Sequence, residues 1–322
     1  MRKGDILNHN LLITGASGFV GSHLVDQLDY KRFKVIQTLR KGQGGSETAN
    51  SSYHIIGDIN EKTDWSSALK KIDIVIHLAA RAHMMNDTSQ DPLAEFRKVN
   101  TSGTVHLANQ AVAAGVKRFI FLSTVKVNGE STDNSPFHPD DPPNPNDPYA
   151  ISKLEAENRL IKLGQESGME IVIIRPPLVY GPGVKGNFAR LLSFVKKELP
   201  LPLGNTGNKR SLVYVKNLCS FIETCITNKE AANQIFLVSD GNDISTTELL
   251  RQIAFAFGKE SRLFPFPRFM IKWIAKLLGR SNEYQRLFGS LQLNIEKNKN
   301  LLGWTPPKSS QEGILETVNA YK

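Results

Sequence analysis

Cysteine and long apolar runs are both scarce in this sequence, and each shortage excludes a class of protein. Only two cysteines, Cys219 and Cys225, occur among 322 residues. Six residues apart in a helical-looking stretch, they would point to different sides of the helix, so we expect neither a disulfide framework nor a metal site. No stretch approaches the roughly 18 apolar residues of a membrane span, and the apolar run 11–13 is too short for a signal peptide. We therefore expect a cytoplasmic protein without an integral membrane segment.

An acidic excess is also lacking. The 40 lysines and arginines outnumber the 31 acidic residues, which gives a formal net charge of +9. Nucleic acid, a polyanionic small substrate such as a diphosphate, a membrane surface and simple solvation would each account for this excess. Basic residues are scattered and no nucleic-acid motif is present, so we expect no nucleic acid partner. The hydrophobic fraction of 40% and the charged fraction of 22% are those of an ordinary globular chain.

Short apolar runs alternate with helical patterns through the first half of the chain. The strand-like runs are 11–13, 34–36, 53–56, 72–76, 119–122 and 171–174, and the helical patterns are 20–28, 63–70, 92–114 and 149–166. Runs of this kind, bounded by turns and separated by helices, predict a parallel α/β sheet covered on both faces. The segment 133–148 holds six prolines and predicts a surface loop before a functional helix.

A glycine-rich turn at residues 14–21 follows the first strand and opens the first helix. Its G-x-x-G-x-x-G spacing suits a backbone that turns sharply and approaches a pyrophosphate, with helix N–H groups facing the phosphate oxygens. A tight turn without a ligand is the alternative, but the strand before it and the helix after it favour dinucleotide binding. The residues expected to bind the dinucleotide here are Gly15, Ser17, Gly18, Phe19, Val20 and Gly21.

The end of the second predicted strand has no acidic residue. The segment reads Thr38-Leu39-Arg40-Lys41, so a carboxylate for a free ribose 2′-hydroxyl is missing and Arg40 could meet a 2′-phosphate instead. This favours NADP, or the use of both NADP and NAD, and a solvated basic strand end is the alternative. After the third strand, Asp58 could accept the adenine amino group, with Ile59 beside it, although aspartate also forms turns that bind nothing.

Tyr149 and Lys153 are four residues apart and would share one face of a helix that Asp147 caps. A free tyrosine has a pKa of roughly 10 and is a poor base at neutral pH. A nearby ammonium and a positive nicotinamide ring would favour the phenolate, which makes Tyr149 a proton shuttle for a hydroxyl or ketone. A surface helix pair gives the same spacing by chance. Thr124, at the end of an apolar strand, would orient the reacting oxygen, and Ser123 is the neighbouring candidate.

Together these motifs resemble the extended short-chain dehydrogenase/reductase family, the NAD-dependent epimerase/dehydratases of nucleotide sugars. The matching segments are 14–21, 57–58, 77–80, 99–100, 123–124, 149–153 and 175–182. The resemblance implies a Rossmann-type doubly wound sheet in residues 1–175 and a smaller substrate-binding region in residues 176–322, from which some segments return to the sheet. It implies that Thr124 orients the substrate, Tyr149 is the acid/base and Lys153 holds the nicotinamide ribose. It also places at the cofactor Leu78, Ala79, Ala80, Asn100 and Pro176.

The same resemblance implies a UDP-sugar substrate whose diphosphate is held by Asn187 and Arg210. A planar guanidinium gives a phosphate two parallel hydrogen bonds, although a surface arginine is the alternative for Arg210. The R-P-G-D string of many epimerases is missing, and residues 285–289 read Gln-Arg-Leu-Phe-Gly instead, which leaves the contacts at the sugar end open. The residues expected near the sugar are Ser123, Thr124 and Lys126.

Likeness at residues 77–83, 123–130 and 237–241 is closer to the 4-keto reductases of bacterial surface-polysaccharide pathways such as O-antigen. These make UDP-N-acetylquinovosamine from UDP-4-keto-6-deoxy-N-acetylglucosamine, so we predict reduction at C4 by an exchanging NADPH or NADH. The alternative is a UDP-glucose or UDP-N-acetylglucosamine 4-epimerase, which retains its NAD. A non-catalytic NADP-binding protein is disfavoured because the tyrosine–lysine pair is retained.

Residues 268–280 form a basic, amphipathic stretch with two interpretations. Its apolar side packs on the domain and leaves the lysines solvated, or the stretch makes weak contact with a membrane surface. Members of the family are often dimers, so a homodimer is a further expectation, to which the sequence assigns no interface.

Overall fold

The structure is a computed structural model that describes residues 9–40, 50–82, 89–133 and 135–322. Within these ranges a seven-stranded sheet has the order β3-β2-β1-β4-β5-β6-β9, and every strand pair in it is parallel. In that order its strands are Ser51–Ile56, Phe33–Arg40, His9–Thr14, Ile74–His77, Arg118–Leu122, Glu170–Arg175 and Gln234–Leu237. This is the doubly wound order of a Rossmann-type sheet, so the expected fold class is confirmed.

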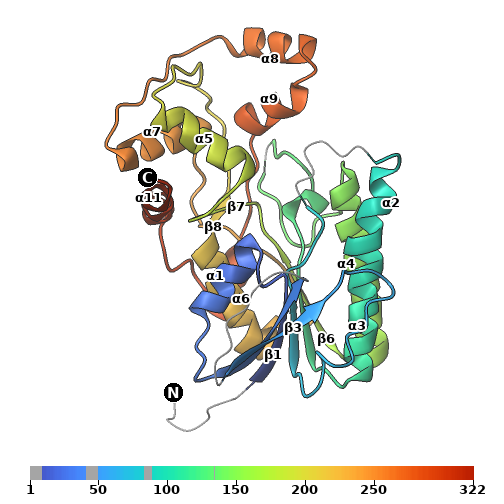
Figure 1. The fold of residues 1–322 in the computed structure, drawn as a ribbon. Helices are drawn as coiled ribbons and strands as arrows, with labels where there is room; N and C mark the ends of the chain where they lie inside the picture. Colours follow the sequence, from blue (N-terminus) through green and yellow to red (C-terminus); the bar gives the residue numbers. More distant parts are fainter. Residues whose placement is uncertain (1–8, 41–49, 83–88, 134) are drawn as a thin grey trace.

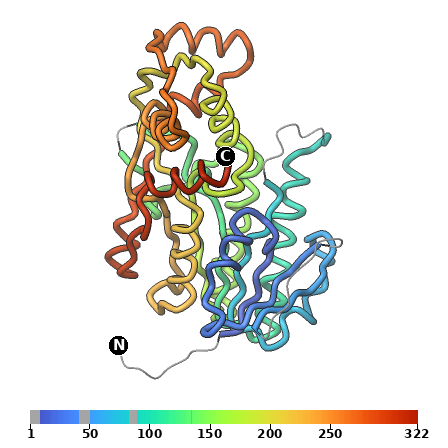
Figure 2. The backbone as a smooth tube through the Cα atoms, turned by 60° about the vertical axis from the view of Figure 1, so that its left-hand side comes forward, coloured from blue at the N-terminus to red at the C-terminus, as the bar shows by residue number. Residues whose placement is uncertain are grey.

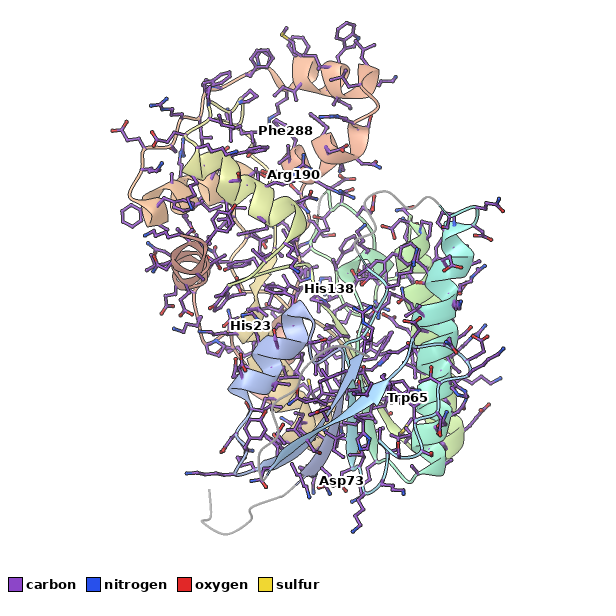
Figure 3. The ribbon with its side chains drawn as sticks, viewed as in Figure 1. His23, Trp65, Asp73, His138, Arg190 and Phe288 are labelled. Carbon is purple, nitrogen blue, oxygen red and sulfur yellow. The ribbon has the colours of Figure 1, made fainter. Side chains whose placement is uncertain are left out.

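A hydrophobic cluster covers each face of the sheet. Successive residues of a strand point to opposite faces, so each strand can contribute to both clusters. In β1, Leu11 and Ile13 belong to one hydrophobic cluster and Leu12 to the other. Buried Trp65 lies on the second side, where Figure 3 labels it. The covering helices are α1 (Phe19–Gln27) and α6 (Val215–Thr227) on the first face, and α3 (Thr104–Ala113) and α4 (Pro148–Ser167) on the second (Figure 1).

The helix expected at residues 92–114 consists of three consecutive pieces. These are α2 (Pro92–Phe96), a π-helical segment (Arg97–Gly103) and α3. The wider π turns direct two buried side chains at α4: Asn100 Nδ2 donates to Ser152 Oγ at 3.1 Å, and Thr101 Oγ1 donates to the Ser152 carbonyl at 2.9 Å. The segment therefore fixes α4 beside the end of the sheet.

The helix expected at residues 63–70 is wrong: the segment forms turns. A side chain of α3 holds the start of this segment. Gln110 Oε1 accepts from the Trp65 N–H at 2.9 Å, and Gln110 Nε2 donates to the Thr63 carbonyl at 3.0 Å. Apolar spacing alone thus suggested a helix where tertiary hydrogen bonds hold a looped chain.

The segment before α4 forms no helix or strand in residues 133 and 135–147, as its prolines predict. Asp147 then caps α4, since its Oδ1 accepts from the Ala150 N–H at 2.7 Å, and Pro148 occupies the first turn. The helix ends at Gly168, whose φ of 78° is the left-handed conformation that glycine adopts at such ends.

Most of the chain beyond residue 176 forms a second body above the sheet (Figures 1 and 2). A two-stranded sheet of β7 (Leu178–Tyr180) and β8 (Leu212–Tyr214) lies there. Strand β9 nevertheless belongs to the main sheet, and helix α6 packs on that sheet. The division at residue 176 therefore stays a prediction. The remaining helices are α5 (Gly186–Lys196), α7 (Thr246–Phe257), α8 (Arg268–Leu277), α9 (Ser281–Phe288), α10 (Glu296–Leu302) and α11 (Ser310–Tyr321), with short 3₁₀ turns η2 (Val125–Val127) and η3 (Lys229–Ala231).

Two expectations about composition can be compared with the structure. Cys219 and Cys225 lie in α6 as free, buried thiols. No helix in the described ranges is both long enough and apolar enough to cross a membrane.

Candidate active site

The carboxyl ends of β1, β4, β5 and β6 meet at one edge of the sheet. The strand register pairs Thr14 with His77, His77 with Phe121, and Leu122 with Ile174. The glycine turn, the loop after β4 and the pair Ser123–Thr124 are therefore neighbours in space although they are far apart in the sequence. In open α/β sheets ligands bind outside this edge.

The glycine turn has the geometry that a dinucleotide pyrophosphate requires. Gly15 has a φ of 71° and its carbonyl accepts from the Gly18 N–H at 2.9 Å, which closes the turn. A Cβ at Gly21 would lie 2.1 Å from the Gly15 oxygen, so only glycine lets the helix start this close. Ser17 and Gly18 are exposed at the start of α1, and Phe19 and Val20 are half-buried. The turn therefore fits a dinucleotide at the helix N-terminus.

A buried hydrogen-bond chain holds the loop after β4 against this turn. The His77 ring contacts Thr14 Oγ1 at 2.6 Å and Thr104 Oγ1 at 2.9 Å, and burial lowers the pKa of His77 to about 3, which keeps it neutral. The Ala79 N–H donates to Thr14 Oγ1 at 3.3 Å. Leu78 and Ala79 are half-buried and Ala80 is exposed, so this loop borders the glycine turn.

Asn100 has a different surrounding from the one expected. It is 1% exposed, its Oδ1 accepts from the Arg81 N–H at 2.8 Å, and its Nδ2 donates to the Arg81 carbonyl at 3.1 Å. With its further bond to Ser152, the amide ties the loop after β4 to α4. Its direct contact with the cofactor stays a prediction.

The adenine end would lie at the outer strands β2 and β3. Arg40 is the last residue of β2, pairs in register with Ile56 and is exposed. Asp58 is exposed just beyond β3, in a turn whose backbone is fixed by the Thr63 hydroxyl donating to the Asp58 carbonyl at 2.9 Å. Ile59 is partly buried and packs against the hydrophobic cluster on the second face of the sheet. Both charged residues are thus exposed at this end, and neighbouring Lys41 lies outside the described residues.

A salt bridge joins the segment that follows Thr124 to the segment that precedes Tyr149. Lys126, two residues after Thr124, forms an ion pair with Asp147, two residues before Tyr149. Lys126 also contacts Glu130 at 3.3 Å. The turn η2 that Thr124 caps is thereby fastened to the first turn of α4. Lys126, expected at the sugar, has its ammonium engaged by two carboxylates and joins the segments that carry Thr124 and Tyr149.

Lys153 is a buried ammonium without a hydrogen-bonding partner among the described residues. It is 1% exposed, and its Nζ lies 3.8 Å from the centre of the Phe121 ring. Burial lowers the pKa of Lys153 to about 7, although the negative charge of Glu157 opposes this. An ammonium in this position suits ribose hydroxyl acceptors, which is a second feature that fits a dinucleotide.

The phenol of Tyr149 differs from the expectation based on spacing. It is half-buried and packs edge-on against Phe96, with ring centres 5.9 Å apart. Burial raises the pKa of Tyr149, and the charge of Asp147 raises it further. The lowering expected from Lys153 is not seen, and the Lys153 ammonium lies over the Phe121 ring instead. Phenolate formation would thus depend on the positive nicotinamide ring.

Glu157 extends the Tyr149–Lys153 row by one more turn and forms a buried ion pair that the motifs did not identify. Arg175, the last residue of β6, contacts Glu157 Oε2 at 2.6 Å, and both side chains are buried. Ser123 Oγ donates to Glu157 Oε1. Ser123, expected near the sugar, is therefore held behind Thr124 by this pair. Buried Pro176 accepts from the Val125 N–H at 2.9 Å and fixes the same loop.

Arg210 and Arg286 lie near enough for their like charges to interact. Arg210 Nη1 donates to the Gly289 carbonyl at 3.1 Å, and burial together with the charge of Arg286 lowers the pKa of Arg210. No ion pair involves either arginine in the described part of the chain. Asn187 is exposed in the first turn of α5, with no hydrogen bond to Arg210. Sequence reasoning missed Arg286, although it read residues 285–289 as a departure from the family string.

The described residues hold no group of three or more His, Cys, Asp or Glu that could bind a metal ion.

Comparison with known proteins decides the family. Residues 11–239 match the model of the NAD dependent epimerase/dehydratase family. The chain belongs to this family. It is 47% identical to UDP-glucose 4-epimerase of Vibrio cholerae over 314 residues, which cover 97% of this chain and 95% of that one. It is 30% identical, over 82% of this chain and 78% of the other, to N-acetyl-alpha-D-glucosaminyl-diphospho-ditrans,octacis-undecaprenol 4-epimerase of Escherichia coli O157:H7.

A solved structure supports the same grouping. UDP-glucose 4-epimerase of Thermotoga maritima with UDP-glucose matches with a TM-score of 0.76 at 26% identity, covering 97% of this chain and 98% of that one. The chain is thus a nucleotide-sugar enzyme of the epimerase/dehydratase type, and its family is NAD dependent. NAD is confirmed as the cofactor, while the preference for NADP inferred from Arg40 stays a prediction. These relatives support the 4-epimerase alternative better than the 4-keto reduction that the motifs favour.

Proposed function

We propose that this protein is a UDP-sugar 4-epimerase acting on UDP-glucose or UDP-N-acetylglucosamine. The observation that carries the proposal is the 47% identity with the Vibrio cholerae UDP-glucose 4-epimerase along nearly the whole of both chains. The site supports it, because a hydroxyl, a phenol and a buried ammonium are grouped at the carboxyl edge of the sheet.

The residues have separate tasks in such a reaction. Tyr149 takes the proton from the C4 hydroxyl of the sugar and later returns one to the same oxygen. Thr124 donates a hydrogen bond to that oxygen and fixes its direction. Lys153 binds the nicotinamide ribose, and its charge opposes the rise in the pKa of Tyr149 once both are held together. Bound NAD supplies the hydride acceptor and donor. Inversion at C4 then requires only that the sugar present its other face to the same groups.

The diphosphate would be held by Arg210 and Arg286. Burial lowers the pKa of Arg210, and the like charge of Arg286 lowers it further. A diphosphate between them removes the repulsion and offers oxygens to both planar guanidinium groups. Asn187 is proposed as an additional contact from the start of α5.

The test is incubation of the purified protein with UDP-glucose and, separately, UDP-N-acetylglucosamine, without added reductant. Appearance of the C4 epimer in either reaction, with no net change in nicotinamide absorbance at 340 nm beyond roughly the enzyme's own concentration, is the expected result. The Tyr149→Phe variant is the control for contaminating activity. Absence of epimer from both sugars, with a folded and NAD-loaded protein, would refute the proposal.

Reduction of a UDP-4-keto-6-deoxy-N-acetylglucosamine is the second candidate. One observation favours it: Arg40 is exposed at the end of β2, and β2 itself ends without a carboxylate for a ribose hydroxyl, which suits a cofactor that exchanges. Stoichiometric oxidation of NADPH or NADH with this ketone, and no epimer from the sugars above, would decide for the reductase. A polyprenyl-diphosphate-linked N-acetylglucosamine forms a third assay, prompted by the Escherichia coli relative.

A further inference from the structure

Helix α8 turns an apolar surface away from the protein. None of its residues is buried. Ile271 and Ala275 are the half-buried positions, and Ile271 packs on the main hydrophobic core. The packing interpretation of residues 268–280 therefore accounts for one narrow row of the helix, and the other rows need another explanation.

Those other rows sort by chemistry. Residues four apart lie on one side of a helix, so α8 presents three parallel rows besides the inward one. Two are apolar and exposed, with Phe269 at 74%, Trp273 at 64% and Leu277 at 66% in one, and Met270 at 41%, Ile274 at 43% and the capping residue Leu278 at 65% in the other. The third is basic and consists of Arg268, Lys272 and Lys276. Exposed apolar patches of this extent mark interaction surfaces.

The chain segment that contains α8 carries charge of one sign. Residues 261–282 contain five basic residues, at 262, 268, 272, 276 and 280, and no acidic residue. No ion pair to Lys272 or Lys276 is formed by any residue that the structure describes. A partner that offers both an apolar layer and negative charge would bury the exposed apolar rows and neutralise the lysines that lack an ion pair.

Helix α8 also has the required position. It lies at the end of the molecule opposite β1, and both views place it there (Figures 1 and 2). Exposed Phe264, at 42%, precedes it in a proline-rich segment. A flat partner could therefore approach α8 without meeting the sheet that binds the dinucleotide.

We propose that α8 docks the protein on an anionic lipid bilayer. The row Phe269–Trp273–Leu277 enters the interfacial region with the neighbouring row Met270–Ile274–Leu278, while the basic row contacts lipid phosphates and carboxylates. A bilayer matches these observations better than a protein partner, because the apolar rows run the whole length of the helix and are bordered by basic side chains. The inference does not depend on which sugar the enzyme converts.

The chain carries its own reporter for this contact. Of its three tryptophans, Trp65 is 0% exposed and Trp304 is 6% exposed, whereas Trp273 is 64% exposed. Any blue shift of tryptophan emission on adding vesicles therefore comes from Trp273. The Trp273→Phe variant should lose the shift and still sediment with the vesicles.

The experiment compares vesicles of phosphatidylcholine alone with vesicles that also contain phosphatidylglycerol. The full-length protein is expected to co-sediment with the anionic vesicles at low salt, with blue-shifted emission, and to dissociate as salt is raised. Removing two charges in Lys272→Ala with Lys276→Ala should weaken binding by roughly thirtyfold. The pair Trp273→Glu with Leu277→Glu should abolish it.

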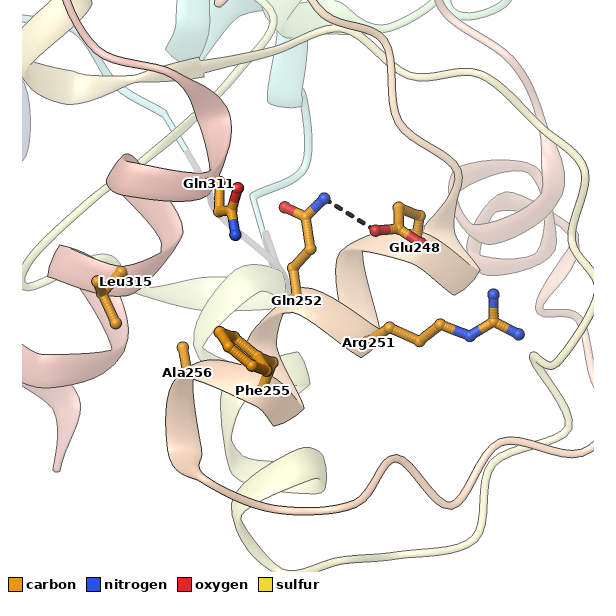
Figure 4. A pocket seen from close by; sticks show the side chains of 7 residues that line it. All are labelled: Glu248, Arg251, Gln252, Phe255, Ala256, Gln311 and Leu315. Atoms are coloured by element: carbon orange, nitrogen blue, oxygen red, sulfur yellow. Dashed lines mark hydrogen bonds between the residues drawn. The ribbon is translucent and has the colours of Figure 1, made fainter.

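A matched control is available elsewhere on the surface. Phe255 on α7 and Leu315 on α11 are also exposed, at 76% and 46%, and they line a shallow pocket with Glu248 and Arg251, where both signs of charge occur (Figure 4). Phe255→Glu with Leu315→Glu changes the net charge and the apolar exposure by similar amounts. This control variant should bind the anionic vesicles as the unchanged protein does.

Three outcomes would overturn the proposal. One is failure of the protein to co-sediment with anionic vesicles at low salt. Another is equal loss of binding in both glutamate pairs, which would attribute the effect to net charge. A third is self-association in sedimentation velocity that the α8 glutamate pair abolishes, together with no vesicle binding, which would assign the face to a second copy of the chain. All the variants change side chains that are exposed, so circular dichroism should show an unchanged fold.

Discussion

Replacing Lys153 with methionine should make the free protein more stable at neutral pH while it removes activity. Lys153 is 1% exposed, and burial lowers its pKa from 10.5 to about 7. A shift of this size corresponds to roughly 5 kcal/mol of disfavoured charge in the folded state. Methionine has a similar length and no charge, so it would remove most of that cost.

The pH dependence follows from the direction of the shift. Between about pH 7 and 10.5 the unfolded chain holds one proton more at Lys153 than the folded chain does. The free energy of unfolding therefore rises with pH in this window, by about 1.4 kcal/mol per unit from this residue. The destabilisation is complete below the folded pKa and vanishes above the unfolded one. The advantage of Lys153→Met should accordingly be largest below pH 7 and shrink toward pH 10.

Urea unfolding of the two proteins across the range from about pH 6 to 9 measures this difference. The buried thiols of Cys219 and Cys225, whose pKa values are raised by burial, act in the opposite direction above pH 9, but they are common to both proteins and cancel. Lys162→Met, at an exposed site of the same helix, is the control and should change little. A difference between wild type and Lys153→Met that is independent of pH, or that grows with pH, would refute the reasoning.

Three further predictions concern other residues of the candidate site. Tyr149→Phe should reduce turnover by roughly 10²- to 10⁴-fold and leave NAD affinity, measured by titration, unchanged; a minor loss of turnover would disprove its role. Arg286→Ala should weaken competition by UDP by roughly tenfold or more with kcat little changed, and equal UDP affinity would exclude it from the diphosphate site. Glu157→Gln should lower the free energy of unfolding by roughly 3–5 kcal/mol, because buried Arg175 loses its counter-charge, and unchanged urea unfolding would contradict this.

Local patterns predicted the parts of the site that depend on one stretch of backbone. The turn at residues 14–21 could be recognised because a close helix start demands glycine at Gly21, whatever the rest of the fold does. The pair Tyr149 and Lys153 could be placed on one face because helical periodicity fixes residues four apart. The helix start was also predictable, since Asp147 caps it locally.

Contacts between distant segments were beyond such patterns. Arg210 and Arg286 approach each other across 76 residues of sequence, and the backbone bond from Arg210 to Ile244 that helps position them has no local signature. The turns at residues 63–70 were mistaken for a helix because the start of the segment is fixed by hydrogen bonds to Gln110, which lies on another element. In both cases the deciding partner is remote in the chain.

One row of α4 combines catalysis with structure. Tyr149, Lys153 and Glu157 follow one another at intervals of four; Tyr149 is half-buried, and Lys153 and Glu157 are each 1% exposed. The inner end forms a direct ion pair, Glu157 with Arg175. Lys153 has the Phe121 ring beside it and no ion pair among the described residues, so the charge of Glu157 compensates it only in part. The partly compensated charge therefore lies one turn from the phenol, where the ribose and nicotinamide of the cofactor would be needed to stabilise it. Cofactor binding would therefore relieve the buried charge of Lys153, which favours tight retention of NAD. Tight retention of the cofactor favours the epimerase over an enzyme that exchanges its cofactor.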